Sequence, residues 1–125
     1  KMQNYNSKFK SDIKTRCYKF SLETISFINT LPNNRAAWTI SDQLLRSATS
    51  IGANLTEGSA ASSRLEYKKF YEIALKSANE TKYWLSLLRD SGIADKAKTE
   101  ELLREATELA NMLAAGVMKL KRKNF

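Results

Sequence analysis

The residues of this sequence best suited to metal chemistry are three glutamates, Glu101, Glu105 and Glu108, which fall on one face of an expected helix. Carboxylates so spaced could bind a metal ion, but bundle-type metal centres add Glu-x-x-His pairs. The sequence contains no histidine. Lys98 and Arg104 also stand nearby, so we interpret this face as solvated. We predict no metal site and no cofactor.

A second pair of carboxylates, Glu57 and Glu80, is expected at the edges of the core. If the two converged in a pocket, they could perform general acid–base hydrolysis. The alternative is that each makes hydrogen bonds at a helix end or between helices. Cys17 lies on an apolar stripe with no base near it, which indicates a small core residue. We therefore predict no catalytic residues and no enzymatic activity, and keep a hydrolase as the less favoured alternative.

The segment SATSIGANLTEGSAASS, residues 47–63, consists almost entirely of small residues. It lacks the Gly-x-x-x-x-Gly-Lys-Ser/Thr spacing of a phosphate-binding loop and follows no strand. Glycine inside a helix costs about 1 kcal/mol relative to alanine, so Gly52 indicates close packing against a facing helix or another subunit. Ser50 and Asn54 could hydrogen-bond to that neighbour. The residues that we assign to close packing or structural hydrogen bonds are Ala48, Ser50, Gly52, Asn54, Glu57, Gly58, Ser77 and Glu80.

Four helices must position these residues. Pro32, Gly58 and Gly92 divide the chain into segments with apolar positions three and four apart, the spacing of bundle helices. We predict helices over residues 7–31, 36–57, 63–91 and 95–122. Because the connections are short, the helices should form an all-α, up-down-up-down antiparallel four-helix bundle, with residues 1–125 as a single domain.

The expected helix ends carry recognisable signals. Gly58 is a natural left-handed residue after the second helix. Ser63 and Glu66 have the spacing of a capping box at the start of the third. Gly92 followed by Ile93 predicts a Schellman stop, and Asp95 is a plausible N-cap of the fourth helix.

The chain is basic, with 21 Lys and Arg against 13 Asp and Glu, a net charge of +8 and a pI near 9.7. Such a balance favours nucleic acid or an acidic protein surface as partner. In the predicted bundle, the start of the first helix, the turn between helices two and three and the end of the fourth meet at one pole. The cations expected to contact phosphates there are Lys10, Lys14, Arg16, Arg64, Lys68, Lys69, Lys119, Lys121 and Arg122.

One plainer interpretation of this charge is also open. The basic C-terminal end could merely complement a helix dipole and keep the protein soluble. Against this, three distant clusters converge, and Tyr5, Phe9 and Tyr18, which could stack on unpaired bases, lie among the cations.

Cellular context and self-association follow from composition. A single cysteine indicates a reducing compartment, and no apolar run approaches the length of a membrane span. We therefore expect a cytoplasmic protein with no membrane partner.

The sequence has more large aromatic residues than a small core readily buries. Some of them are therefore expected at a subunit interface. The candidates are Trp38, Tyr71, Tyr83 and Trp84.

The segments Asp42–Ala48 and Ser50–Gly58 resemble the signature of the bacterial four-helix bundle family of proteins encoded by intervening sequences of ribosomal RNA genes. The spacing of Ala74, Ser77 and Glu80, followed by Tyr-Trp-Leu at residues 83–85, is similar to that family's third helix. Two positions depart modestly: Leu55 stands where isoleucine is usual, and Leu45 where a second basic residue often stands.

The resemblance implies a homopentamer around a central channel. It also implies kinship with the accessory variability protein of diversity-generating retroelements, a basic pentamer that binds a reverse transcriptase and nucleic acid. No catalytic residues are implied.

The favoured hypothesis is a non-enzymatic, oligomeric accessory protein that binds RNA or single-stranded DNA through its phosphate backbone, together with a reverse transcriptase. The alternative is an interaction scaffold whose basic pole binds an acidic protein without binding nucleic acid.

Overall fold

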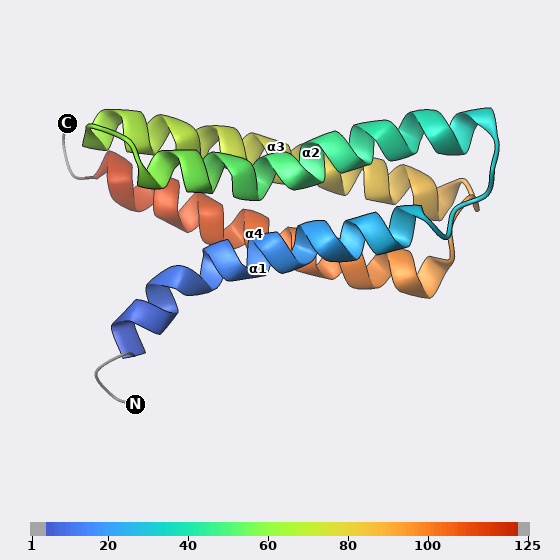
Figure 1. Ribbon diagram of the computed structural model, residues 1–125, viewed down its shortest axis with the longest axis horizontal. Coiled ribbons are helices and arrows are strands. Elements are labelled where there is room, and N and C mark those ends of the chain that lie inside the picture. The colour runs from blue at the N-terminus through green and yellow to red at the C-terminus, as the bar shows by residue number, and fades with distance from the viewer. Residues whose placement is uncertain (1–4, 123–125) are drawn as a thin grey trace.

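The computed structural model describes residues 5–122, with side chains described from Ile13 onward. Four helices, α1 (Tyr5–Ile28), α2 (Arg35–Ser59), α3 (Arg64–Asp90) and α4 (Lys96–Lys121), account for most of this range, which contains no strand. The helices run antiparallel to their chain neighbours (Figure 1). The predicted all-α, antiparallel four-helix architecture is confirmed.

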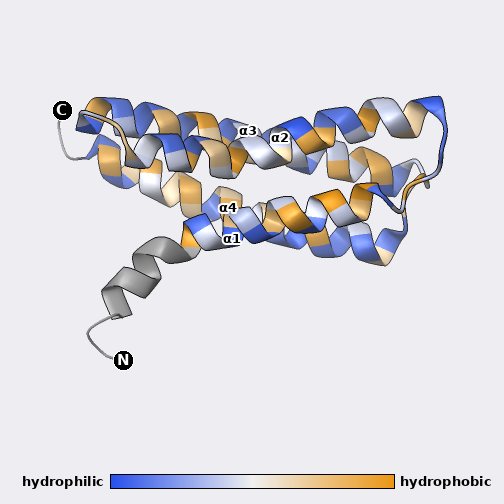
Figure 2. Ribbon diagram, viewed as in Figure 1, coloured by the Kyte–Doolittle hydropathy of each residue, from blue (hydrophilic) through white to orange (hydrophobic). Residues whose placement is uncertain are grey.

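Each helix packs against two neighbours around the bundle, in the order α1, α2, α3, α4 and back to α1. The seams of α3 with α2 and α4 are the most extensive, and the seam between α1 and α4 is the least. Apolar segments recur along all four helices between polar ones (Figure 2). Leucine, alanine and phenylalanine fill most of the core, with Cys17 fully buried among them as predicted.

The first helix ends earlier than its periodicity predicts. Beyond Ile28 the chain tightens, with Thr30 N–H donating to the Phe27 carbonyl and Leu31 N–H to the Ile28 carbonyl. These bonds span three residues rather than four, so the last predicted turn is a tighter, non-α turn.

Gly58 was wrongly predicted as a left-handed stop. It lies inside α2, which continues to Ser59, and the N–H of Ala60 closes the helix on the Glu57 carbonyl. Gly58 instead serves packing, because a Cβ there would lie 3.0 Å from the Cβ of Phe70. Its replacement by a larger residue would push α3 away.

The other predicted helix ends are confirmed in part: the caps form, but at the predicted Schellman stop Ala94 N–H, rather than Ile93 N–H, donates to the Leu88 carbonyl. The Ser63 hydroxyl accepts a hydrogen bond from Glu66 N–H at 3.1 Å, although the Glu66 carboxylate accepts from Ser62 N–H at 2.8 Å rather than from Ser63. Asp95 caps α4 by accepting from Lys98 N–H at 2.9 Å. Gly92 has φ +77°, the left-handed conformation that suits glycine after a helix. Its N–H donates to the Arg89 carbonyl at 3.3 Å.

The small-residue segment of α2 packs against both neighbouring helices. A Cβ on Gly52 would lie 3.2 Å from the Cβ of Cys17, so α1 is the close neighbour at this point. On the α3 side, the hydroxyls of Ser50 and Ser77 are hydrogen-bonded at 2.9 Å. The amide of Asn54 donates within its own helix, to the carbonyl and hydroxyl of Ser50, and not across to α3 as one alternative had it. Within the described range, no helix is long and apolar enough to cross a membrane.

Candidate nucleic-acid interface

One end of the bundle gathers cations from three parts of the chain. The α2–α3 turn and the C-terminal end of α4 lie at this end (Figure 1). Lys14 of α1 reaches it too, because its Nζ donates to the Ser59 hydroxyl at 2.6 Å. We call this surface the basic pole, and it comprises Lys14, Arg64, Lys68, Lys69, Lys119, Lys121 and Arg122.

Most cations of the basic pole are exposed to solvent. Lys68 is half-buried, with its Nζ 3.7 Å from a carboxylate oxygen of Glu72. In the described part of the chain, Lys69, Lys119 and Lys121 form no ion pair. Such side chains keep their charge available to an external anion.

The α2–α3 turn forms a shallow hollow of about 330 Å³ within the basic pole, lined by serines, Arg64 and Tyr67. The N-terminus of α3 opens beside it and adds the positive end of a helix dipole. The Glu66 carboxylate, which accepts from the hydroxyl and N–H of Ser62, partly offsets that charge.

The opposite end of the bundle carries acidic residues in balance with cations, among them Arg89, Lys96 and Lys98. Asp90 and Asp95 lie at the α3–α4 connection, and Glu100 and Glu101 follow in α4. Arg89 hydrogen-bonds Asp90 at 2.8 Å and lowers the pKa of that carboxyl. The molecule is electrically polarised along its length.

Arg16 differs from the other predicted phosphate contacts. Its guanidinium donates to both carboxylate oxygens of Glu105, at 3.0 and 2.7 Å, and to Glu108 at 2.5 Å. These hydrogen bonds, those to Glu105 first, raise the pKa of Arg16 further above its usual range. Because the guanidinium is already neutralised by α4, we remove Arg16 from the candidate interface.

The same contacts correct the interpretation of the glutamate face of α4. Glu105 is partly buried and binds Arg16, so the face is not simply solvated. Glu101 is exposed and lines a groove between α1 and α4. In the described residues, no group of three or more Asp, Glu, Cys or His side chains could hold a metal ion.

The other predicted residues fall in different places. Lys10 lies outside the described side chains, as do Tyr5 and Phe9. Tyr18 is exposed on α1. Four aromatic residues were expected to supply a subunit interface. Of these, Trp38 and Tyr83 are exposed, whereas Trp84 and Tyr71 pack against the core.

Glu57 and Glu80 do not form a carboxylate pair. Glu80 accepts hydrogen bonds from the Arg46 guanidinium and, at 2.9 Å, from the indole N–H of Trp84. Glu57 is exposed and lies farther along α2, about 16 Å beyond Arg46 at the usual rise of a helix. A hydrolase of the kind considered from the sequence would need the carboxylates of Glu57 and Glu80 in one pocket, and they are not close together.

Polar contacts continue along the seam between α2 and α3. The Thr81 hydroxyl lies within hydrogen-bond distance of the Ser47 hydroxyl across the seam, at 2.9 Å, and of the Ser77 carbonyl in its own helix, at 2.7 Å. Together with the Ser50–Ser77 and Arg46–Glu80 contacts, this ladder fixes how α2 and α3 align. Of the residues assigned from sequence to close packing, Ser50, Ser77 and Glu80 lie on this seam, whereas Gly52 faces α1 and Glu57 is exposed.

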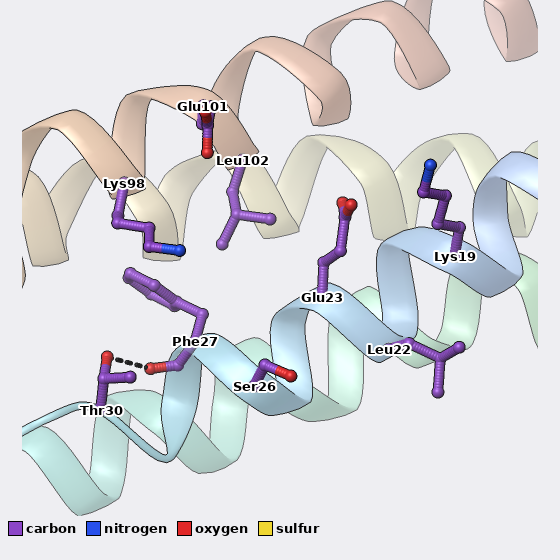
Figure 3. A pocket seen from close by; sticks show the side chains of 9 residues that line it. All are labelled: Lys19, Leu22, Glu23, Ser26, Phe27, Thr30, Lys98, Glu101 and Leu102. Atoms are coloured by element: carbon purple, nitrogen blue, oxygen red, sulfur yellow. Dashed lines mark hydrogen bonds between the residues drawn. The ribbon is translucent and has the colours of Figure 1, made fainter.

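Sequence reasoning missed two features. The first is that Gly116 of α4 packs against the ring of Tyr71. This close contact could have been predicted, because a glycine inside a helical pattern indicates close packing, as it did at Gly52. The second is the groove of about 500 Å³ between α1 and α4, with Phe27 and Leu102 on its floor (Figure 3). Nothing in the spacing of either helix predicts it, because it depends on how far apart the two helices lie.

The fold and this surface define a class: a basic four-helix bundle with its cations gathered at one end. The chain belongs to the 23S rRNA-intervening sequence protein family, whose model matches residues 10–115. The resemblance stated from the sequence is thus confirmed. No curated protein matches the chain.

A solved structure supports the assignment. The chain is similar to a protein of unknown function from the S23 ribosomal protein family of Bacteroides thetaiotaomicron VPI-5482, with 34% sequence identity and a TM-score of 0.79. The match covers 84% of this chain and 97% of that one. The bundle is therefore the family's fold.

Proposed function

We propose that the basic pole binds the phosphate backbone of RNA or single-stranded DNA, and that the protein acts as a non-enzymatic accessory factor. One observation carries the proposal: cations from α1, the α2–α3 turn and the end of α4 converge at one end, while acidic and basic residues are balanced at the other. A polyanion approaching such a dipole is oriented before contact.

The chemistry of the basic pole favours backbone contacts over base recognition. Most of its cations are lysines, which act as flexible point charges toward phosphate. No described element resembles a base-reading motif, so we expect little sequence preference and a strong dependence on salt.

Fluorescence anisotropy of a labelled 20-nucleotide single-stranded RNA, titrated between 50 and 300 mM salt, tests the proposal. The logarithm of the affinity should fall linearly with the logarithm of salt concentration, by about 0.7 for each phosphate neutralised. The double variant Lys119→Glu/Lys121→Glu should bind at least tenfold more weakly.

A matched control is Lys96→Glu/Lys98→Glu, which makes the same change in net charge at the opposite end of the bundle. Equal losses in both variants, or affinity that does not respond to salt, would contradict a localised polyanion site. Binding of polyglutamate without any binding of RNA would favour the alternative, a scaffold for an acidic protein partner.

We also propose that the protein assembles as a homopentamer and acts with a reverse transcriptase, as the family resemblance implies. A ring of five requires head-to-tail contacts, since two-fold contacts alone close as pairs. Light scattering should give five times the 14.2 kDa chain mass. Co-purification with a co-expressed retroelement reverse transcriptase tests the partner, and its failure would leave RNA binding unaffected.

A further inference from the structure

The hollow at the α2–α3 turn has one aromatic ring among small residues. Its lining consists of Tyr67, Arg64 and five small residues, Gly58, Ser59, Ala61, Ser62 and Ser63. Its volume of about 330 Å³ lies at the lower end of the range of ligand pockets. Because the small residues leave space beside the ring, a flat group can enter the hollow from solvent.

The ring of Tyr67 is held by two neighbours. Its centroid lies 5.3 Å from that of Tyr71, with the two ring planes tilted by 56°. Its Cδ1 atom lies 3.5 Å from the place of a Cβ on Gly58, an ordinary contact distance. Tyr67 is half-buried by this packing, and its accessible part lines the hollow. A ring fixed in this way needs little ordering when a second aromatic group stacks on it.

The serines of the hollow are already paired with a carboxylate. Glu66 accepts hydrogen bonds from the N–H and the hydroxyl of Ser62, at 2.8 and 3.1 Å. The N–H of Glu66 in turn donates to the Ser63 hydroxyl. These donors are therefore used within the protein, and a phosphate among them would meet the Glu66 carboxylate. A neutral group is the better occupant of the hollow.

Positive charge stands around the hollow. Ser59 accepts from Lys14 Nζ at 2.6 Å, so an ammonium group lies at the rim. Lys68 and Lys69 follow Tyr67 directly in α3, and the end of α4 lies at the same end of the bundle (Figure 1). A strand whose phosphates contact these cations holds its bases within reach of the hollow.

We propose that the hollow takes an unpaired nucleobase, which stacks on the ring of Tyr67 while the neighbouring phosphates contact the lysines of the basic pole. This inference rests on the proposed function and adds which part of the nucleic acid is held there. Stacking on an aromatic side chain tolerates any sequence, because every base has a π-face.

Such a site distinguishes single strands from duplexes. In a duplex each base is covered on both faces by its neighbours in the stack, whereas the bases of a single strand can be splayed out onto aromatic side chains. Single strands should therefore gain affinity from Tyr67. Duplexes should bind through the cations alone.

Fluorescence anisotropy with the labelled 20-nucleotide RNA, alone and annealed to its complement, tests the inference. Tyr67→Leu should weaken binding of the single strand about fivefold to a hundredfold and binding of the duplex less than twofold. Tyr67→Phe keeps the ring and should bind both as the wild type does. Ala61→Leu fills the hollow and leaves Tyr67 in place, so it should repeat the loss for the single strand.

The salt dependence separates stacking from charge. In Tyr67→Leu the logarithm of the affinity should fall with the logarithm of salt concentration at the wild-type slope, because every lysine of the basic pole is retained. The matched control is Tyr83→Leu, since Tyr83 is 59% exposed on the same helix and lies about 24 Å farther along it. This control should bind single strands as the wild type does.

Circular dichroism establishes that each variant is folded. The inference is overturned, while the proposed function stands, if single-stranded RNA binds with the expected salt dependence but Tyr67→Leu leaves its affinity unchanged. The same holds if Tyr67→Leu weakens duplex binding equally, or if Tyr83→Leu loses as much. Absence of any RNA binding by the wild type would overturn both.

Discussion

The ring of Tyr71 in α3 lies directly against Gly116 in α4. A Cβ atom at position 116 would lie 2.4 Å from Cε2 of Tyr71 and 3.0 Å from Cδ2. Packed side chains do not come so close, so the ring occupies the space that any other residue at this position would need. The contact joins the last part of α4 to α3 near the basic pole.

Gly116→Ala should therefore destabilise the protein. Helix propensity alone would stabilise alanine by about 1 kcal/mol, but displacing a packed aromatic ring costs roughly 1–3 kcal/mol. We expect a lower midpoint of urea denaturation for this variant. In a Tyr71→Leu background the same substitution should become neutral or stabilising, and equal effects in both backgrounds would contradict the role of the ring.

Replacing Arg16 by methionine should weaken the attachment of α1 to α4. The change leaves the carboxylates of Glu105 and Glu108 close together without their shared cation, and losing hydrogen bonds to a charged group costs about 1.5–3 kcal/mol. Arg104→Met, on an exposed residue of α4, should change the free energy of unfolding little. RNA affinity of the Arg16 variant should stay within twofold of the wild type, and a tenfold loss would return Arg16 to the interface.

Glu80→Ala should cost more stability than Glu57→Ala. Glu80 accepts from the exposed Arg46 and from the partly buried indole of Trp84. Leaving that indole N–H without its acceptor costs about 1–3 kcal/mol, whereas Glu57 is exposed. In a Trp38→Phe background, Trp84 is the remaining tryptophan, and its emission should change only in the Glu80 variant. Equal stability of the two variants would show that the contacts of Glu80 are not needed.

The buried thiol of Cys17 should make stability fall at alkaline pH. Burial raises the pKa of Cys17 to about 12 from an ordinary value of 9.0, so the unfolded chain loses this proton first. The stabilising contribution is complete below about pH 9 and is lost as the pH rises toward 12, with a limiting slope of about 1.4 kcal/mol per pH unit.

Urea titrations between pH 8 and 11 measure that slope. Cys17→Ala should decline less steeply, because the remaining alkaline loss comes from other groups, including Tyr71, whose pKa burial raises to about 12. The thiol should also resist Ellman's reagent at pH 8 in the folded protein. Rapid labelling without denaturant would contradict its burial.

Sequence reasoning was reliable where the cause is local. Ser63 and Asp95 cap their helices because a hydroxyl or carboxylate at that position reaches a free N–H within one turn. Gly58 shows where the same reasoning fails. Its glycine was attributed to a helix end, but the need arises from Phe70 on another helix.

The residues of the candidate site also fall into those that local sequence places correctly and those that it does not. The charge clusters at the α2–α3 turn and the end of α4 lie where the predicted topology puts them, since short connections force neighbouring helices to run antiparallel. Arg16 belongs to the same stretch of sequence as Lys14, yet one side chain reaches Ser59 and the other reaches Glu105. Two residues along a helix change the direction of a side chain by about 200°, which separates a cation that reaches the basic pole from one that is paired with α4.

By itself the sequence determined four amphipathic helices, most of their ends, the buried position of Cys17 and the uneven charge along the bundle, because each of these follows from spacing or from immediate neighbours. The tertiary structure alone decided that Arg16 binds Glu105 and Glu108, that Glu80 binds Arg46 and Trp84, and that Gly116 accommodates Tyr71. Those contacts join helices whose relative rotation and register are set by packing of the whole core, and no local pattern specifies them.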